Sequence, residues 1–195
     1  MKVSKKLSSA AFKCRGLFWG VFAVGALIFP GHFGVARFIA GLLILLAGQA
    51  LRFYAAGFIP KYRTETIGAP VLVTWGPFRW VRNPLYAGNF IMGIGWALMM
   101  SWTWVAVFTA AFWVLYCLII IPAEEEFLLG KFGAEYDAFR KKVPPLLPFP
   151  RGGAVDRSPD ERPFNMKTAR AEEIYSIRMN ILITAVIAAR LYFTI

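Results

Sequence analysis

The sequence predicts an all-α integral membrane protein: a helical bundle with about five transmembrane helices and a cytoplasmic amphipathic helix. Three observations lead to this prediction. Hydrophobic residues make up 58% of the 195 residues, above the roughly 45–50% of a soluble domain. They are concentrated in five long apolar segments. Basic residues gather in alternate polar segments, as the positive-inside rule predicts for a chain that crosses a membrane several times.

The five spans are predicted at about residues 16–30, 35–58, 85–102, 104–122 and 177–195, and the whole chain, 1–195, is predicted to form one domain. A span needs about 20 residues, so the short first and third apolar segments need flanking residues to cross. The first segment resembles the apolar part of a signal peptide. No small-residue cleavage pattern follows it, and we interpret it as a retained helix.

Basic residues predict the orientation of the chain. They occur in the N-terminal tail, in residues 59–85 and in residues 123–176, whereas the alternate loops "PGHFG" and "SWT" have none. This asymmetry predicts a cytoplasmic N-terminus and a C-terminus outside. In a membrane protein, a net charge of +11 indicates contacts with anionic phospholipid, not with nucleic acid.

Cysteine and histidine are scarce. Cys14 and Cys117 are far apart and form no CxxC pattern, and His32 is the single histidine. The sequence therefore indicates neither a disulfide framework nor a zinc site, and no metal is expected in the mechanism.

The third and fourth spans are predicted to form a tight antiparallel hairpin, because only residues 101–104 separate them. Small residues in the third span favour close helix packing. The segments that flank this hairpin, residues 70–88 and 122–149, should therefore meet at one cytoplasmic mouth. In the second segment, Pro122 and Glu124 are typical of a helix start, and Arg140, Lys141 and Lys142 suit its end. "TARAEEIYSIRMN" is predicted to begin a helix that continues into the fifth span.

Several polar side chains would gather at this mouth: Arg79, Arg82, Asn83, Tyr86, Glu124 and Glu125. Such a set suits S-adenosylmethionine. Its ribose hydroxyls and ammonium group can donate to carboxylates, and its carboxylate can accept from the planar fork of an arginine.

The stretches "LVTWGPFRWVRNPLYAG" and "EEEFLLGKFGAEYDAFRKKVPPLLPF" resemble the isoprenylcysteine carboxyl methyltransferase and phospholipid methyltransferase superfamily. The resemblance covers about residues 70 to 149. It implies that both stretches hold S-adenosylmethionine while a lipid-like acceptor enters from the bilayer. By this resemblance the catalytic residues are Arg82, Glu125 and Tyr86. The cofactor-binding residues are Leu72, Val73, Gly76, Pro77, Asn83, Pro84, Tyr86, Gly88, Glu124 and Glu125.

Two departures from the family pattern bear on the methyl acceptor. Asn83 stands where the family has a histidine, and Pro70 stands at a second histidine position. Asn83 resembles the phospholipid N-methyltransferase branch, whereas the "VPPLLPF" tail resembles the carboxyl methyltransferase branch. The acceptor therefore stays open between a prenylcysteine-type carboxylate and a phospholipid amine.

Two other functions compete with this interpretation. Sterol reductases that use NADPH share a similar turn, although they usually have an acidic residue where this chain has Asn89. A non-catalytic membrane scaffold would explain the absence of both motif histidines. The sequence also leaves open the oligomeric state, the role of residues 150–176, and whether Arg52 snorkels to the membrane surface or is paired inside the bundle.

Overall fold

The structure is a computed structural model that describes residues 15–28, 34–60, 71–147 and 160–193. Within these ranges every regular element is a helix and there is no strand, which confirms the all-α prediction. The described residues leave out residue 70 of the first predicted cofactor segment, residues 148–149 of the second, residues 150–159 and most of the basic N-terminal tail.

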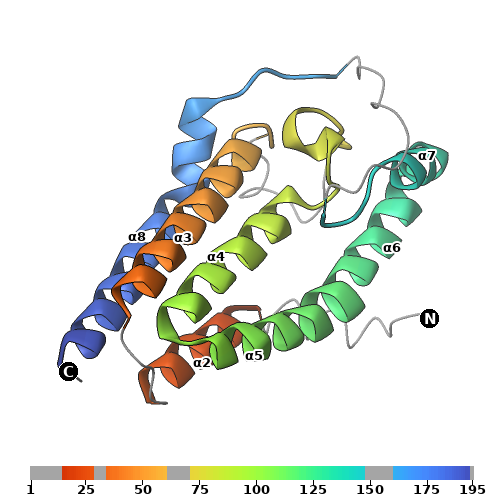
Figure 1. The fold of residues 1–195 in the computed structure, drawn as a ribbon. Helices are drawn as coiled ribbons and strands as arrows, with labels where there is room; N and C mark the ends of the chain where they lie inside the picture. Colours follow the sequence, from red (N-terminus) through yellow and green to blue (C-terminus); the bar gives the residue numbers. More distant parts are fainter. Residues whose placement is uncertain (1–14, 29–33, 61–70, 148–159, 194–195) are drawn as a thin grey trace.

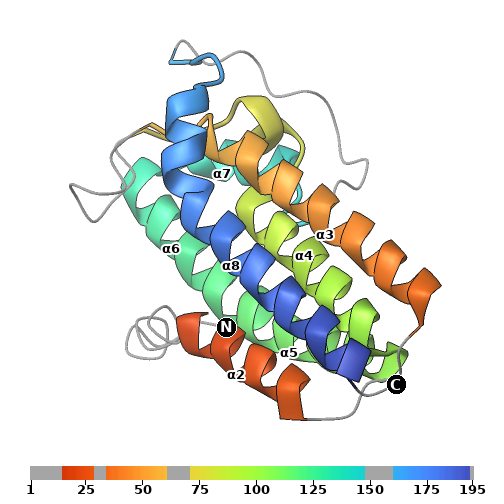
Figure 2. The same ribbon diagram turned by 90° about the vertical axis from the view of Figure 1, so that its left-hand side faces the viewer.

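The elements follow one another along the chain as a set of packed helices (Figures 1 and 2). They are α2 (Arg15–Ile28), α3 (Val35–Ala56), the 3₁₀ turn η1 (Gly76–Arg79), α4 (Pro84–Met100), α5 (Trp102–Phe112), the π-helical stretch η2 (Trp113–Ile120), α6 (Ile121–Phe132), α7 (Ala134–Lys142) and α8 (Met166–Phe193). Both views place η1 at one end of the bundle and α2 at the other.

Helices α3 and α4 pack closely because glycines remove side chains from their contact. A Cβ atom at Gly41 would lie 2.6 Å from the carbonyl oxygen of Gly95, and one at Gly48 would lie 2.7 Å from the amide nitrogen of Met92. Small residues allow such close approach between helices. The prediction of close packing along the third span is thereby confirmed.

The hairpin between α4 and α5 is also confirmed, and it is tighter than predicted. Ser101 alone separates the two helices, and its Oγ accepts a hydrogen bond from the backbone N–H of Trp104 at 3.3 Å. This is the N-cap arrangement, in which a side-chain oxygen satisfies a free N–H of the first turn.

The predicted helix start at Pro122 is wrong. Helices α5, η2 and α6 form one continuous helix from Trp102 to Phe132. Proline has no N–H and its ring conflicts with the carbonyl four residues earlier. The preceding turns take π-helical spacing, and the N–H of Ile121 donates to Tyr116, five residues back. The break comes instead at Gly133, whose φ of +53° favours glycine.

Within the part of the chain that the structure describes, two helices are long and apolar enough to cross a membrane: α3 and the continuous helix from Trp102 to Phe132. Helices α2 and α4 have 14 and 17 residues, and a full span takes about 20. Helix α8 runs unbroken from Met166, so the predicted continuation of "TARAEEIYSIRMN" into the fifth segment is confirmed. The set of five spans and the cytoplasmic amphipathic helix stay predictions.

An aromatic cluster joins α2 to the hairpin. Phe22 packs edge-on against Trp104 and Phe108, with ring centroids 5.4 and 5.0 Å apart. Trp19 donates from Nε1 to the hydroxyl of Tyr116 at 3.1 Å. Tyr116 lies in the π-helical stretch and is almost fully buried, so α2 closes this side of the core.

Candidate functional site

The first predicted cofactor segment forms a turn followed by a helix start. Gly76 has a φ of +58°, and a Cβ atom there would lie 2.7 Å from Cδ2 of Phe58, so this position requires glycine. Pro77 is buried in the first turn of η1. Pro84 occupies the first position of α4, where its missing N–H costs nothing.

The second predicted segment returns to the same end of the bundle. Helix α6 presents Glu124 and Glu125, Gly133 redirects the chain into α7, and residues 143–147 run back toward the start of α4 (Figure 1). Both glutamates are partly buried, whereas the neighbouring Glu126 is exposed.

Arg82 joins the two segments. Its Nε and Nη2 donate to Oε1 of Glu125 at 2.9 and 2.6 Å. Its Nη1 donates to the backbone carbonyl of Arg140 at 2.6 Å and to that of Val143. The Arg82 and Glu125 side chains are only 10% and 19% exposed. We call this set of contacts the Arg82 clamp.

Backbone hydrogen bonds reinforce the clamp. The N–H of Arg82 donates to the carbonyl of Pro144 at 2.9 Å, and the N–H of Asn83 donates to that of Pro145 at 3.1 Å. The side chain of Asn83 donates to the same Pro145 carbonyl through Nδ2 at 3.0 Å. The predicted meeting of the two flanking segments is therefore confirmed as geometry.

A small second core lies beneath the clamp. Leu72 packs there against Tyr136, Phe139 and Val143 of α7 and its end. Burial and the nearby Glu125 carboxylate raise the pKa of the Tyr136 phenol. Tyr136 therefore stays neutral at physiological pH, and Leu72 has a packing contact besides its predicted cofactor role.

The remaining predicted residues lie either at the mouth or in the contact between α3 and α4. Tyr86 is buried in the first turn of α4, with its ring edge-on to Tyr116 at 5.2 Å between centroids. Gly88 faces α3, because a Cβ atom there would lie 2.4 Å from Cγ of Arg52. Val73 is half-buried just before η1. The catalytic and cofactor-binding roles of the predicted residues stay predictions.

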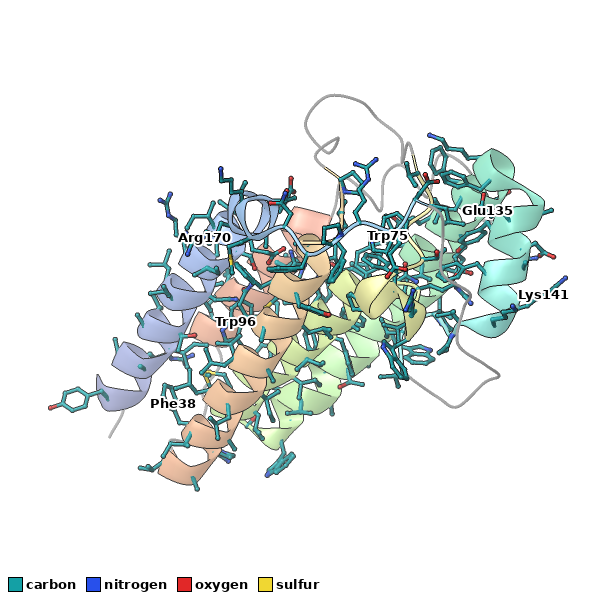
Figure 3. All side chains as sticks on the ribbon, turned by 90° about the horizontal axis from the view of Figure 1, so that it is seen from above. Phe38, Trp75, Trp96, Glu135, Lys141 and Arg170 are labelled. Atoms are coloured by element: carbon teal, nitrogen blue, oxygen red, sulfur yellow. The ribbon has the colours of Figure 1, made fainter. Side chains whose placement is uncertain are left out.

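Unsatisfied polar atoms at the mouth fit a polar ligand. Trp75 lies between the helices (Figure 3), and its indole Nε1 is buried with no hydrogen-bond acceptor among the described residues. The same holds for Nε of Arg79 within the described part of the chain. Both hydrogen bonds from Arg82 to Glu125 end on Oε1, so Arg82 does not occupy Oε2, the second carboxylate oxygen. Buried donors without acceptors are rare in native proteins.

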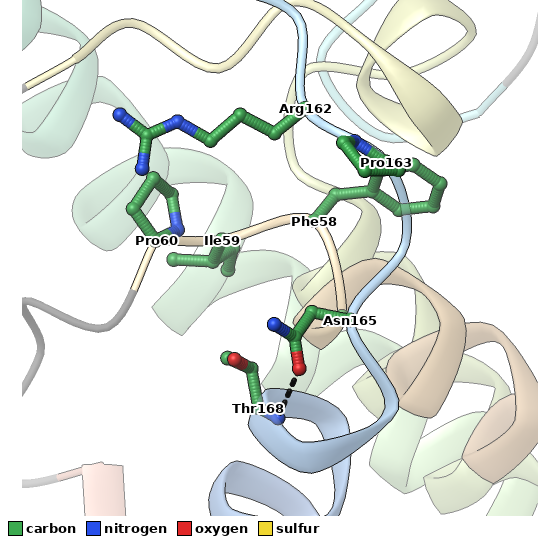
Figure 4. A pocket seen from close by; sticks show the side chains of 8 residues that line it. Phe58, Ile59, Pro60, Arg162, Pro163, Asn165 and Thr168 are labelled. Atoms are coloured by element: carbon green, nitrogen blue, oxygen red, sulfur yellow. Dashed lines mark hydrogen bonds between the residues drawn. The ribbon is translucent and has the colours of Figure 1, made fainter.

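A cavity of about 300 Å³ lies beside this mouth, between residues 57–60 at the end of α3 and the segment that leads into α8 (Figure 4). Its wall includes Phe58, the residue that packs against Gly76. The leading segment is tied down by Asn165, whose N–H donates to the carbonyl of Gly57 at 2.9 Å. An exposed ion pair between Glu161 and Arg79 at 2.7 Å links the same segment to η1.

The structure also decides the position of Arg52, which the sequence left open. Arg52 is paired inside the bundle with Glu173 of α8, with Nη2 2.7 Å from Oε1 and Nε 2.9 Å from Oε2. The sequence did contain a signal for such a pair, because a charged residue within an apolar span usually has a buried partner. The sequence could not identify which acidic residue it is.

Comparison with known proteins places this fold in a family. The sequence model of the phospholipid methyltransferase family matches residues 35–135, from the start of α3 to the start of α7. Protein-S-isoprenylcysteine O-methyltransferase of Xenopus laevis is 32% identical over 142 residues, which cover 69% of this chain and 49% of that protein. The protein of the same name from Homo sapiens is 33% identical over 130 residues, 60% of this chain and 43% of that protein.

A differently named relative shares the same region. Steroid 5-alpha-reductase of Solanum lycopersicum is 33% identical over 114 residues, which cover 57% of this chain and 42% of that protein. The chain thus spans less than half the length of each of these three relatives. The family match itself covers more than half of this chain and includes η1, Arg82 and Glu125. This protein therefore belongs to the phospholipid methyltransferase family.

Proposed function

We propose that this membrane protein is a methyltransferase that transfers the methyl group of S-adenosylmethionine to a lipid-like acceptor. The observation that carries the proposal is the Arg82 clamp, which joins the two motif segments into one partly buried mouth. The relatives named protein-S-isoprenylcysteine O-methyltransferase share this region of the chain.

The mouth offers the donors and acceptors that such a methyl donor needs. In this proposal Oε2 of Glu125 and the carboxyl group of Glu124 accept from ribose hydroxyls or the ammonium group. The N–H of Trp75 and the Nε–H of Arg79 are buried donors for carboxylate or ring nitrogen atoms. In this proposal Arg82 positions Glu125, because its guanidinium group is bound to that carboxylate and to two backbone carbonyls.

The chemistry requires little beyond alignment. S-adenosylmethionine supplies a sulfonium methyl group, which passes in line to the nucleophile as the carbon–sulfur bond breaks. Holding the two reactants in contact lowers the entropic part of the barrier. A carboxylate acceptor gives up no proton. An amine acceptor must first lose one, and Glu124, Glu125 and Tyr86 are the groups at the mouth that can assist.

The acceptor enters from the bilayer at the cytoplasmic side in this proposal. Most described basic residues lie at the mouth end of the bundle, on η1 and the loop after it, on α6 and α7, and on the segment that leads into α8 and its first turns. The positive-inside rule predicts such a surface to be cytoplasmic. On α7, Arg140 and Lys141 share Asp137 at 2.7 and 2.6 Å. Their exposed heads can also contact anionic lipid phosphates.

Binding of the methyl-transfer product tests the proposal. Calorimetry with S-adenosylhomocysteine on the purified protein in lipid nanodiscs should give binding that Glu125→Ala weakens at least tenfold. Glu126→Ala is the matched control, because this exposed neighbour makes no contact with Arg82 and should bind as the wild type does. Absence of binding to the wild type would reject the proposal.

The same preparation distinguishes the competing acceptors and functions. Labelled S-adenosylmethionine with total lipid and a prenylcysteine should yield a base-labile methyl ester if the acceptor is a carboxylate. A base-stable product indicates an amine. The steroid 5-alpha-reductase relative makes a reductase the second candidate, and preferential binding of NADPH would favour it.

A further inference from the structure

A network of polar side chains crosses the interior of the bundle and joins α3, α4 and α8. Glu173 accepts from Arg52 through both carboxylate oxygens and from Nε2 of Gln49 at 3.0 Å. Nη1 of Arg52 donates to Oδ1 of Asn89 on α4 at 2.6 Å. Asn180 donates to Oε1 of Gln49 at 2.6 Å. The carboxylate at the centre is therefore hydrogen-bonded on both oxygens.

Glu173 is the most unusual member of this network. Its side chain is 0% exposed, and an isolated ionised carboxylate in such a position would be strongly unfavourable. It comes from α8, which lies beyond the region that the family model matches. The bond to Arg52 thus joins a helix outside the matched region to one inside it.

Arg52 contacts the end of the motif at two consecutive residues. Its side chain lies across Gly88, where a Cβ atom would be 2.4 Å from Cγ. Its head donates to Asn89. Both residues lie in the first two turns of α4, directly after the loop that carries Arg82 and Asn83. The position of these turns sets where that loop meets Pro144 and Pro145.

We propose that Glu173 is a positioning residue for the donor site: through Arg52 and Asn89, it holds the start of α4 so that the Arg82 clamp can form. The effect on donor binding rests on the proposed function, whereas the effect on the loop does not. In this arrangement α8 supports the motif loop from inside the bundle.

A purely structural role would give a different pattern. Glu173 would then only dock α8, as Thr184 does when it accepts from Nε1 of Trp96 at 3.2 Å farther along α4. Two variants separate these roles. Asn89→Ala removes the link to α4 and leaves the pair between Arg52 and Glu173 intact. The double variant Arg52→Met with Glu173→Leu replaces the buried pair by apolar groups, a change that often preserves stability.

The test uses the full chain in nanodiscs, with Thr184→Ala as the matched control for loss of a hydrogen bond to α8. Hydrogen exchange is followed in peptides that cover residues 81–86, which include the amide groups that donate to Pro144 and Pro145. Asn89→Ala and the double variant should raise the exchange rate there at least fivefold. Thr184→Ala should leave it unchanged. Melting temperatures record global stability in parallel.

Donor binding supplies the second readout. In a wild type that binds S-adenosylhomocysteine, Asn89→Ala and the double variant should weaken binding about tenfold with a melting temperature close to that of Thr184→Ala. Unchanged exchange in residues 81–86 overturns the inference, whether or not the wild type binds the donor. Unchanged affinity in both variants overturns it as well. A wild type that binds no donor, with exchange raised as expected, rejects the proposed function and leaves the support of the loop by Glu173 standing.

Discussion

Among the described residues, the two most buried arginine–glutamate pairs are similar in length but lie in different surroundings. Arg82 and Glu125 lie 2.6 Å apart at the mouth, and Arg52 and Glu173 lie 2.7 Å apart in the interior of the bundle. Arg82 also binds two backbone carbonyls. The other partner of Arg52 is a side chain, Asn89, and the Glu173 carboxylate also binds the Gln49 side chain.

This difference in partners indicates a difference in role. The two carbonyls belong to the last turn of α7 and the residue that follows it, where helical hydrogen bonds end. Arg82 therefore fixes the end of α7 to the motif loop and binds only one carboxylate oxygen of Glu125. Side chains on three helices instead fix the helices relative to one another. The same ion pair therefore builds a site in one place and a scaffold in the other.

Removal of Arg82 should have the largest effect on the site. Arg82→Ala leaves Glu125 and the carbonyls of Arg140 and Val143 without their donor, and it should weaken binding of S-adenosylhomocysteine by roughly 100-fold, about 2.7 kcal/mol. Arg82→Lys keeps the charge but not the planar fork and should recover only part of this loss. Calorimetry measures both, and an affinity within threefold of wild type in Arg82→Ala would contradict the role of the clamp.

A substitution at Gly88 tests how tightly Arg52, a member of the interior pair, packs against α4. Gly88→Ala places a methyl group against Arg52, and overpacking of this kind costs about 1–3 kcal/mol. Gly130→Ala is the matched control, since its Cβ atom would meet nothing within 4 Å and alanine is the better helix former. Thermal unfolding should show a lower melting temperature for the first variant alone. Equal melting temperatures would mean that α3 and α4 tolerate separation.

The exposed pair between Arg79 and Glu161 should contribute much less than either buried pair. Its side chains are 28% and 34% exposed, and exposed ion pairs contribute about 0–1 kcal/mol. Glu161→Gln should therefore leave the melting temperature within about 2 °C of wild type. The melting temperature is measured at low and high salt. A larger fall would mean that the segment before α8 stabilises the position of η1 more than an exposed ion pair can.

The smallest effect concerns Tyr136 and appears only at alkaline pH. Burial and Glu125 raise the pKa of its phenol in the folded state above the usual 10.0. The stability that comes from keeping Tyr136 neutral is therefore fully present below pH 10 and is lost as the pH rises above it. Tyr136→Phe cannot ionise, so its melting temperature should fall less than that of wild type between pH 9 and pH 11. If the melting temperatures of the two proteins changed with pH in the same way, the phenol of Tyr136 would be solvated and not buried.

Sequence reasoning was most successful where short-range chemistry determines structure. The short connection between α4 and α5 and the close packing of the small residues on α4 each follow from local geometry. The meeting of residues 71–88 with residues 122–147 followed from the hairpin, because antiparallel helices return their flanks to the same end. The predicted helix start at Pro122 was wrong because the π-helical stretch before it lets the helix continue through the proline. No local sequence signal marks such a stretch.

The sequence by itself therefore determined the all-helical fold, the short hairpin and the two segments that form the mouth. Only the tertiary structure decided that Arg82 binds backbone carbonyls as well as Glu125, and that Gly88 packs against Arg52. It also selected Glu173, 121 positions away, as the partner of Arg52. The physical reason is that local patterns constrain neighbours within a turn or a helix, whereas the pairing of buried charges depends on how distant helices pack.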